Sequence, residues 1–118
     1  MSKVEFSQRE IKNGTGCMVT FAETLDDQLE KAFAEYIASQ IESGVKYYIF
    51  DFRYTQIVQS PAVASILGMA DLIVSEKSRS LCTCNMSTMN EKIFEMVGLF
   101  MYADYCKTED IAIKSFGE

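Results

Sequence analysis

The central segment of the chain, residues 45–54, most constrains the fold because it is apolar at consecutive positions. Its β-branched and aromatic residues are Tyr47, Tyr48, Ile49, Phe50 and Phe52. A strand of this composition is typical of the middle of a parallel sheet, where helices bury both faces. Asp51 and Arg53 stand near the end of the segment, as expected where a strand emerges toward solvent. The chain is therefore expected to form a sheet with helical cover.

The clearest helix signal lies upstream of this strand. Apolar side chains recur at helical spacing over residues 25–41, and most acidic side chains fall off that stripe. Thr24 or Asp26 is expected to cap this helix, and Gly44 is placed to end it.

Two further helices follow the central strand. The second is expected to have Ser60 as its N-cap and Pro61 as its first helical residue, and to run to Val74. The third begins at residues 88–91, which have the spacing of a capping box, and Gly98 closes it.

The remaining apolar segments complete the order of elements. Residues 4–11 and 17–22, separated by a glycine-containing turn, predict an opening hairpin. Residues 79–85 and 99–105 predict two more strands, and a last helix opens at 108–110, where acidic residues suit its positive first turn. Strands that alternate with helices after a hairpin predict an α/β fold: a mixed, mostly parallel sheet of four to five strands covered by about four helices.

Length and charge limit the classes of function. The 118 residues suit one domain spanning 1–118. Asp and Glu number 17 against 11 Lys and Arg, a formal charge of −6, which argues against nucleic-acid binding and against docking on an anionic membrane through basic residues. The chain has no histidine, the commonest general base and metal ligand. We therefore expect a protein that is not an enzyme and carries no cofactor.

The sequence shows neither a membrane-spanning segment nor a secretory signal, which predicts where in the cell the protein is found. No run approaches the roughly 18 to 20 apolar residues that a membrane span requires. Residues 1–6 do not show the basic and then apolar pattern of a secretory signal, so a cytoplasmic protein is expected.

The four cysteines are Cys17, Cys82, Cys84 and Cys106. In a reducing compartment they are most simply free thiols packed as small hydrophobic side chains. Cys82 and Cys84 lie two apart on a predicted strand and point to the same face, but their spacing from the other two matches no zinc pattern, so no metal site is expected.

Ser60 is the main candidate site because it stands at a strand-to-helix junction, where open α/β sheets present their chemistry. Serine is also a preferred N-cap, so a purely structural role is the alternative. A capping hydroxyl that is exposed there could still accept a phosphoryl group, which would gain from the helix dipole and would add about −1.5 to −2 charges to the surface.

Two further sets of residues, the acidic side chains of the first helix and the methionines around the third, are expected to have structural roles. Asp26, Asp27, Glu30 and Glu35 lie on the polar side of the first helix, where solvation is expected. The four methionines around the third helix are expected to pack in the core, with an adaptable protein-binding surface as the alternative. They are Met86, Met89, Met96 and Met101.

Several segments resemble the STAS domain, the fold of bacterial anti-sigma factor antagonists. Residues 47–68, from the Tyr-Tyr-Ile-Phe-Asp-Phe strand to Gly68, carry the main likeness. Residues 80–85 resemble the family's next core strand, 90–100 its third helix and following turn, and 22–26 its entry to the first helix. The resemblance covers about residues 4–116, in the family's order and at nearly its spacing.

The resemblance implies a function in bacterial signal transduction and transcription regulation. In this family an unmodified antagonist binds an anti-sigma factor that is also a serine kinase, and phosphorylation of a loop serine abolishes binding. Ser60 falls on the phosphorylated position of the family's Asp-Ser-Ser/Thr-Gly loop. The implied partner-binding residues are Gln56, Ile57, Val58, Gln59, Ser60, Pro61, Ala62 and Ser65.

Two alternatives stay open. Gln59 and Pro61 depart from the family loop, which favours a constitutive, non-phosphorylated STAS adaptor in a signalling or transport assembly. A small enzyme or thiol-redox protein that uses Cys82 and Cys84 is a third interpretation, but no base, metal set or nucleotide loop accompanies these thiols.

Overall fold

The computed structural model of the chain describes residues 6–116. Its main sheet has five strands in the order β1-β2-β4-β6-β7, with β4 in the middle. The strands are β1 Phe6–Ile11, β2 Gly16–Phe21, β4 Tyr47–Asp51, β6 Ser80–Cys84 and β7 Asp104–Cys106. Strand β1 is antiparallel to β2 and every other pair is parallel. The predicted mixed, mostly parallel sheet is confirmed; Val4, where the first strand was expected to begin, lies outside the described residues.

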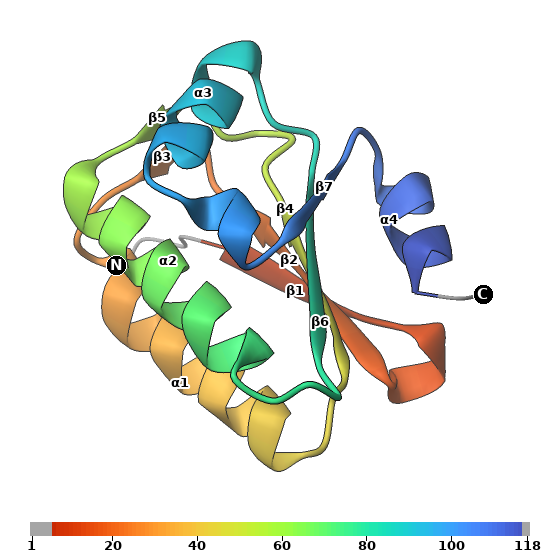
Figure 1. Cartoon of the computed structure of the whole chain (residues 1–118). Coiled ribbons are helices and arrows are strands. Elements are labelled where there is room, and N and C mark those ends of the chain that lie inside the picture. Colours follow the sequence, from red (N-terminus) through yellow and green to blue (C-terminus); the bar gives the residue numbers. More distant parts are fainter. Residues whose placement is uncertain (1–5, 117–118) are drawn as a thin grey trace.

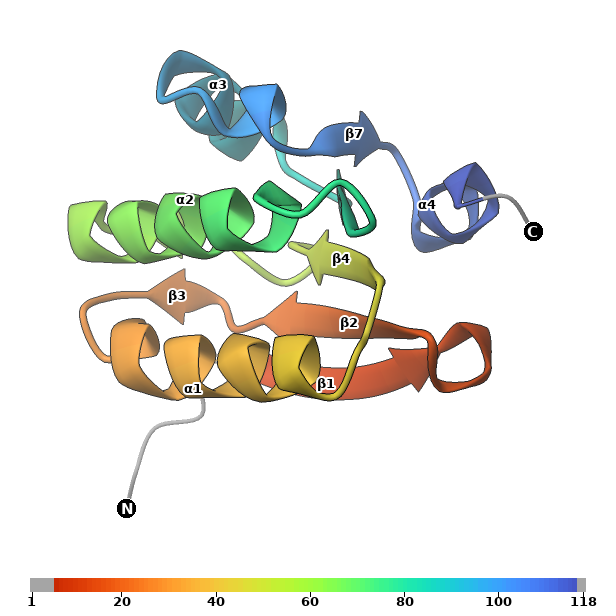
Figure 2. The ribbon, with the colours of Figure 1, turned by 60° about the horizontal axis from the view of Figure 1, so that its bottom comes forward.

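Helices cover both faces of this sheet, as Figures 1 and 2 show. The helices are α1 Leu29–Glu42, α2 Ser60–Val74, α3 Thr88–Met96 and α4 Glu109–Ser115, with short 3-10 turns at η1 Lys12–Gly14 and η2 Leu99–Met101. Helices α1 and α2 lie side by side on one face, and α4 lies alone on the other. None of the helices in residues 6–116 is long and apolar enough to cross a membrane.

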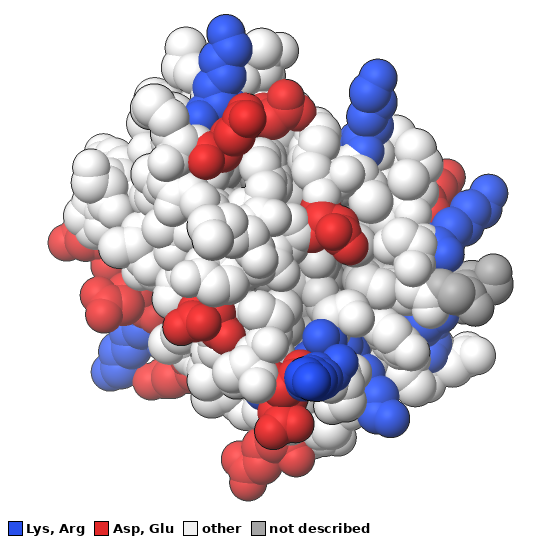
Figure 3. Space-filling view, viewed as in Figure 1, with Lys and Arg blue, Asp and Glu red and all other residues white. Residues whose placement is uncertain are grey.

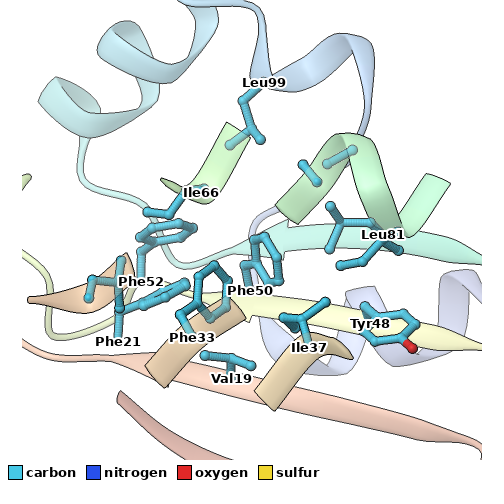
Figure 4. Close-up of a cluster of buried hydrophobic side chains, with 14 of the residues drawn as sticks. Val19, Phe21, Phe33, Ile37, Tyr48, Phe50, Phe52, Ile66, Leu81 and Leu99 are labelled. Atoms are coloured by element: carbon cyan, nitrogen blue, oxygen red, sulfur yellow. The ribbon is translucent and has the colours of Figure 1, made fainter. Parts of the chain in front are cut away.

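The larger core lies between the sheet and helices α1 and α2, and aromatic rings fill it (Figure 4). The ring of Phe21 stacks on Phe52 with centroids 4.9 Å apart, and Phe33 meets Phe50 edge to face at 5.4 Å. Phe94 from α3 joins them, 5.2 Å from Phe52. Full burial of one such side chain stabilises the fold by roughly 1.5–3 kcal/mol.

The smaller core explains why β4 is apolar on both faces. Ile49 points to the face under α4, whereas its neighbours Tyr48 and Phe50 belong to the larger core. The smaller core consists of Ile11, Met18, Ile49, Cys82, Cys84 and Ala112. Because β4 is buried from both sides, it has the central position that its composition predicts.

A second sheet of two short parallel strands was not predicted. It joins β3 Thr24–Leu25 to β5 Ile57–Val58. The expectation that Thr24 or Asp26 caps the first helix is therefore wrong, because α1 begins only at Leu29, after a turn in which the Asp26 carboxylate accepts the Gln28 amide at 3.0 Å. Two-residue strands pair through the backbone alone and leave no period in the sequence.

Other helix ends agree with prediction to within one residue. Gly44 and Gly98 have φ values of 85° and 90° and follow the ends of α1 and α3, as glycines that close helices do. Helix α4 opens at residues 108–110 as expected, and Thr108 caps it, with its hydroxyl accepting the Ile111 amide at 3.3 Å. The cap of α3 is Ser87 and not Thr88.

Candidate functional site

Ser60 is exposed at the start of α2, but it is not the cap of the helix. Gln59 holds the N-cap position, with φ −78° and ψ 159°, and its carbonyl accepts the amides of Ala62 and Val63. Ser60 is the first helical residue, so the predicted capping role is wrong. Within residues 6–116 its hydroxyl makes no hydrogen bond, which leaves the oxygen open to solvent.

The loop that carries Ser60 is held by hydrogen bonds at several points. The amides of Gln56 and Ile57 both donate to the Glu23 carbonyl, at 2.8 and 3.1 Å, and the Gln59 amide donates to the Leu25 carbonyl at 2.9 Å. These are the bonds of the β3–β5 pair and its extension. A backbone fixed in this way presents the serine hydroxyl in one place, which favours recognition by a protein over a loosely held loop.

The other predicted partner-binding residues differ in exposure. Gln56, Ile57, Gln59 and Pro61 are exposed, and Val58 is half-buried. Among the rest, Ser65 is half-buried and its hydroxyl donates to the Pro61 carbonyl at 3.1 Å. Ala62 is fully buried, so its methyl group belongs to the core and cannot contribute to a contact surface.

The surroundings of Ser60 are acidic. The exposed residues Glu23, just before β3, Asp27, just before α1, and Glu30, in the first turn of α1, carry the charge. Figure 3 shows carboxylates over the edge where α1 and α2 begin. A hollow of about 330 Å³ between the two helices is lined by Glu30, Pro61 and five other residues. A phosphate on Ser60 would add charge to a surface that is already negative, and Pro61 has no N–H to offer it.

The methionines around α3, which the sequence analysis expected to pack in the core, are mostly exposed. Met89, Met96 and Met101 are 69%, 83% and 87% exposed, so the expected core packing is wrong for these three and right only for Met86. Helical spacing predicted the buried Phe94 but missed the buried Asn90, because a nine-residue helix carries too few turns to define its buried face.

The thiols form no site within the described residues. Cys17, Cys82 and Cys84 are buried and unpaired, as predicted, and Cys106 is half-exposed. Burial raises the pKa of Cys17 to about 11 and those of Cys82 and Cys84 to about 12, so they are protonated at neutral pH. No group of three or more metal-ligating side chains occurs in residues 6–116.

A polar network that the sequence did not indicate surrounds Asp51 at the end of β4. The fully buried carboxylate accepts hydrogen bonds from Arg53 Nε at 2.8 Å, Asn85 Nδ2 at 2.9 Å and Thr20 Oγ1 at 3.1 Å. Arg53 continues to Glu109 of α4 at 2.8 Å. Each oxygen of the Asp51 carboxylate therefore has a hydrogen-bond partner within the protein. Because Arg53 contacts both Asp51 of β4 and Glu109 of α4, the network fastens α4 to the sheet.

Comparisons with known proteins agree with this architecture. No family model and no curated protein matches the chain. Among solved structures, the phosphorylated form of SpoIIAA, a Bacillus cell fate determinant, is 20% identical over 94% of this chain and 98% of that one, with a TM-score of 0.74. The unphosphorylated anti-sigma factor antagonist SpoIIAA is 20% identical over 94% and 95%, with a TM-score of 0.78.

A third structure extends the likeness to another bacterial genus. An anti-sigma factor antagonist from Mycobacterium paratuberculosis is 11% identical over 96% of this chain and 93% of that one, with a TM-score of 0.80. The chain therefore has the fold of the anti-sigma factor antagonists, the STAS fold that the sequence resemblance predicted.

Proposed function

We propose that this chain is an anti-sigma factor antagonist-like regulator of the bacterial cytoplasm, acting as a single domain over residues 1–118. It binds an anti-sigma factor that is also a serine kinase, and phosphorylation of Ser60 ends the binding. The observation that carries the proposal is the exposed Ser60 hydroxyl, which has no hydrogen-bond partner in residues 6–116 and sits on a loop held in place by backbone hydrogen bonds.

The docking surface consists of the exposed or half-buried side chains around Ser60. They are Gln56, Ile57, Val58, Gln59, Pro61 and Ser65. An exposed Ile57 at the centre of such a surface provides apolar area, and the polar neighbours provide hydrogen bonds at its rim.

Phosphorylation opposes docking through charge and hydration. The phosphate adds about −1.5 to −2 charges and must lose water when the partner covers it. Each 1.4 kcal/mol of unfavourable free energy weakens the affinity about tenfold. The exposed Glu23, Asp27 and Glu30 already make this region acidic, so they add to the negative charge of the phosphate and do not neutralise it.

A constitutive STAS adaptor is the second candidate function, and Pro61 favours it. Proline at the second helical position removes one of the free amides that would hold a phosphate at the start of α2, and its fixed φ stiffens the segment that a kinase active site must accommodate. Such an adaptor would use the same surface without being modified.

The test incubates the purified chain with ATP and, one at a time, the kinase-type anti-sigma factors of the source genome. We expect one of them to bind the wild-type chain and to add one phosphoryl group, seen by intact-mass measurement. Ser60→Ala removes the adduct and Ser60→Asp weakens binding at least tenfold. The control Ser75→Ala, at the far end of α2 and outside the docking surface, keeps the adduct. Binding without any adduct supports the adaptor, and equal binding by wild type and Ser60→Asp contradicts the switch.

A further inference from the structure

Helix α3 and the turn η2 expose an unusual amount of apolar surface. Five of the nine exposed large hydrophobic side chains among residues 6–116 lie between positions 89 and 102. They are Met89, Met96, Val97, Met101 and Tyr102. Single exposed apolar residues are ordinary, but a group of this kind marks an interaction surface.

The methionines of α3 form a stripe along one side of the helix. Asn90 and Phe94 are buried and face the core, and Met89, Ile93 and Met96 follow at spacings of four and three residues, which places them in one row. The opposite flank carries Glu91, whose charge and hydrogen bond raise the pKa of Tyr105 on β7 after the larger effect of burial. The stripe therefore faces away from β7.

Helix α3, which carries this stripe, lies on the segment that leads to Ser60. Asn90 Nδ2 donates to the Thr55 carbonyl at 3.0 Å, and Phe94 packs on Phe52, so α3 rests directly on the loop between β4 and β5. The exposed Ile57 comes two residues after Thr55. Figures 1 and 2 both place α3 beside α2, and Figure 3 shows a stretch without charged side chains between the two helices, bordered by charged side chains over α3.

Charge distinguishes the two ends of this surface. Its apolar end is the methionine stripe, and its other end adjoins the exposed Glu23, Asp27 and Glu30 at the start of α1. In a symmetric dimer built on this surface the same acidic groups would recur on both subunits of a chain that carries a net charge of −6. A different protein with basic groups opposite the carboxylates avoids this repulsion.

We infer that Met89, Met96 and Met101 form the apolar half of the docking surface whose other half is the Ser60 loop. The partner meets these methionines and the Ser60 loop with apolar side chains, so a phosphate on Ser60 would lose its water without gaining a cation. Its lysine or arginine side chains lie only opposite Glu23, Asp27 and Glu30. This inference rests on the proposed function, because it adds residues and a partner chemistry to the same site. Methionine suits the role because its flexible, polarisable side chain adapts to a partner without a preformed pocket.

The test uses the kinase-type anti-sigma factor that binds the chain and a sample with carbon-13 in the methionine methyl groups. The chain has seven methionines, and Met→Leu variants assign their signals. We expect the signals of Met89, Met96 and Met101 to shift or broaden on binding, while that of Met18, buried under α4, stays in place.

Variants then measure how much the stripe contributes. Met96→Gln combined with Met101→Gln is expected to weaken binding at least tenfold, whereas Ile111→Gln, an exposed apolar residue on α4 at the other face, changes it less than twofold. Glu23→Gln with Glu30→Gln weakens binding and reduces its salt dependence. Circular dichroism confirms that each variant is folded.

The outcomes separate this inference from the proposed function. If no kinase-type anti-sigma factor binds the wild-type chain, the proposed function fails and the inference fails with it. If one binds and Ser60→Asp weakens it while the methionine signals and the double variant show no effect, only the inference is overturned. Methionine signals that shift with the concentration of the chain alone indicate a second copy as the occupant and also overturn it.

Discussion

The side-chain amide of Asn90 donates a hydrogen bond of 3.0 Å to the backbone carbonyl of Thr55. Both residues are buried, and the Thr55 hydroxyl donates in turn to the Ala22 carbonyl at 2.9 Å. Through these two residues α3, the loop before β5 and the end of β2 are joined. The position of the Ser60 loop therefore depends on a buried polar contact with a helix that lies thirty residues further along the chain.

Replacement of Asn90 by alanine is expected to destabilise the protein by about 1–3 kcal/mol, because the buried Thr55 carbonyl loses its donor. Urea unfolding followed by circular dichroism measures the change. The control is Lys92→Ala, an exposed position on the same helix, which should stay within about 0.5 kcal/mol of wild type. Equal effects of the two variants would show that the Asn90 contact contributes nothing specific.

Two serines near helix starts should respond differently to replacement by alanine. Ser87 caps α3, and its hydroxyl accepts the Asn90 amide at 3.1 Å, so Ser87→Ala should cost about 0.5–2 kcal/mol. Ser60 has no such bond within the described chain, so Ser60→Ala should be nearly neutral. Thermal unfolding of both variants checks this, and a loss of more than about 1 kcal/mol for Ser60→Ala would restore the capping interpretation.

The buried carboxylate of Asp51 is expected to be important for stability. Asp51→Asn removes its charge and forces at least one of its three side-chain donors to lose an acceptor, which should cost about 1–3 kcal/mol. Asp71→Asn, an exposed carboxylate on α2, serves as the control. Hydrogen exchange should also quicken in α4 of the Asp51 variant, because Arg53 links this carboxylate to Glu109; unchanged exchange there would contradict the fastening role.

Stability should fall in alkaline solution. Burial raises the pKa of Cys84 from 9.0 to about 12, so this thiol stays protonated in the folded chain while it ionises in the unfolded one. The folded state then binds the extra proton, and its stability is complete below about pH 9 and decreases toward pH 12, by at most about 1.4 kcal/mol per pH unit for one thiol. Denaturant unfolding at several pH values should show a shallower slope for Cys84→Ala; an equal slope would refute the assignment.

Alkylation rates test the thiol-redox interpretation. Iodoacetamide near neutral pH should modify the half-exposed Cys106 first, and should reach Cys17, Cys82 and Cys84 only at the rate of unfolding, because the reagent needs an exposed thiolate. Intact-mass measurements with and without denaturant follow the reaction. Rapid modification of Cys82 or Cys84 in the folded protein would favour a reactive thiol after all.

The elements that were predicted correctly are those whose apolar pattern extends over several positions of a strand or several turns of a helix. The apolar segment that became β4 required cover on both faces, and helices α1, α2 and α4 provide it. The helix ends predicted at Gly44 and Gly98 are also confirmed, but for a local reason. The positive φ that closes a helix is a conformation that glycine adopts without help from its neighbours. Shorter features failed: β3 and β5 have two residues each, and the nine residues of α3 did not reveal which methionines face solvent.

The sequence by itself determined the alternation of strands and helices, the central place of β4 and the likeness to the STAS domain, because hydrophobic period and helix-ending residues act over neighbouring positions. Only the tertiary structure decided that Gln59 and not Ser60 caps α2 and that Ala62 is buried. It also decided that Asp51 accepts hydrogen bonds from Thr20 and Asn85 on two distant segments, in addition to its near neighbour Arg53. Exposure and hydrogen-bond partners depend on which distant segments arrive beside a residue, and that arrangement has no period along the chain.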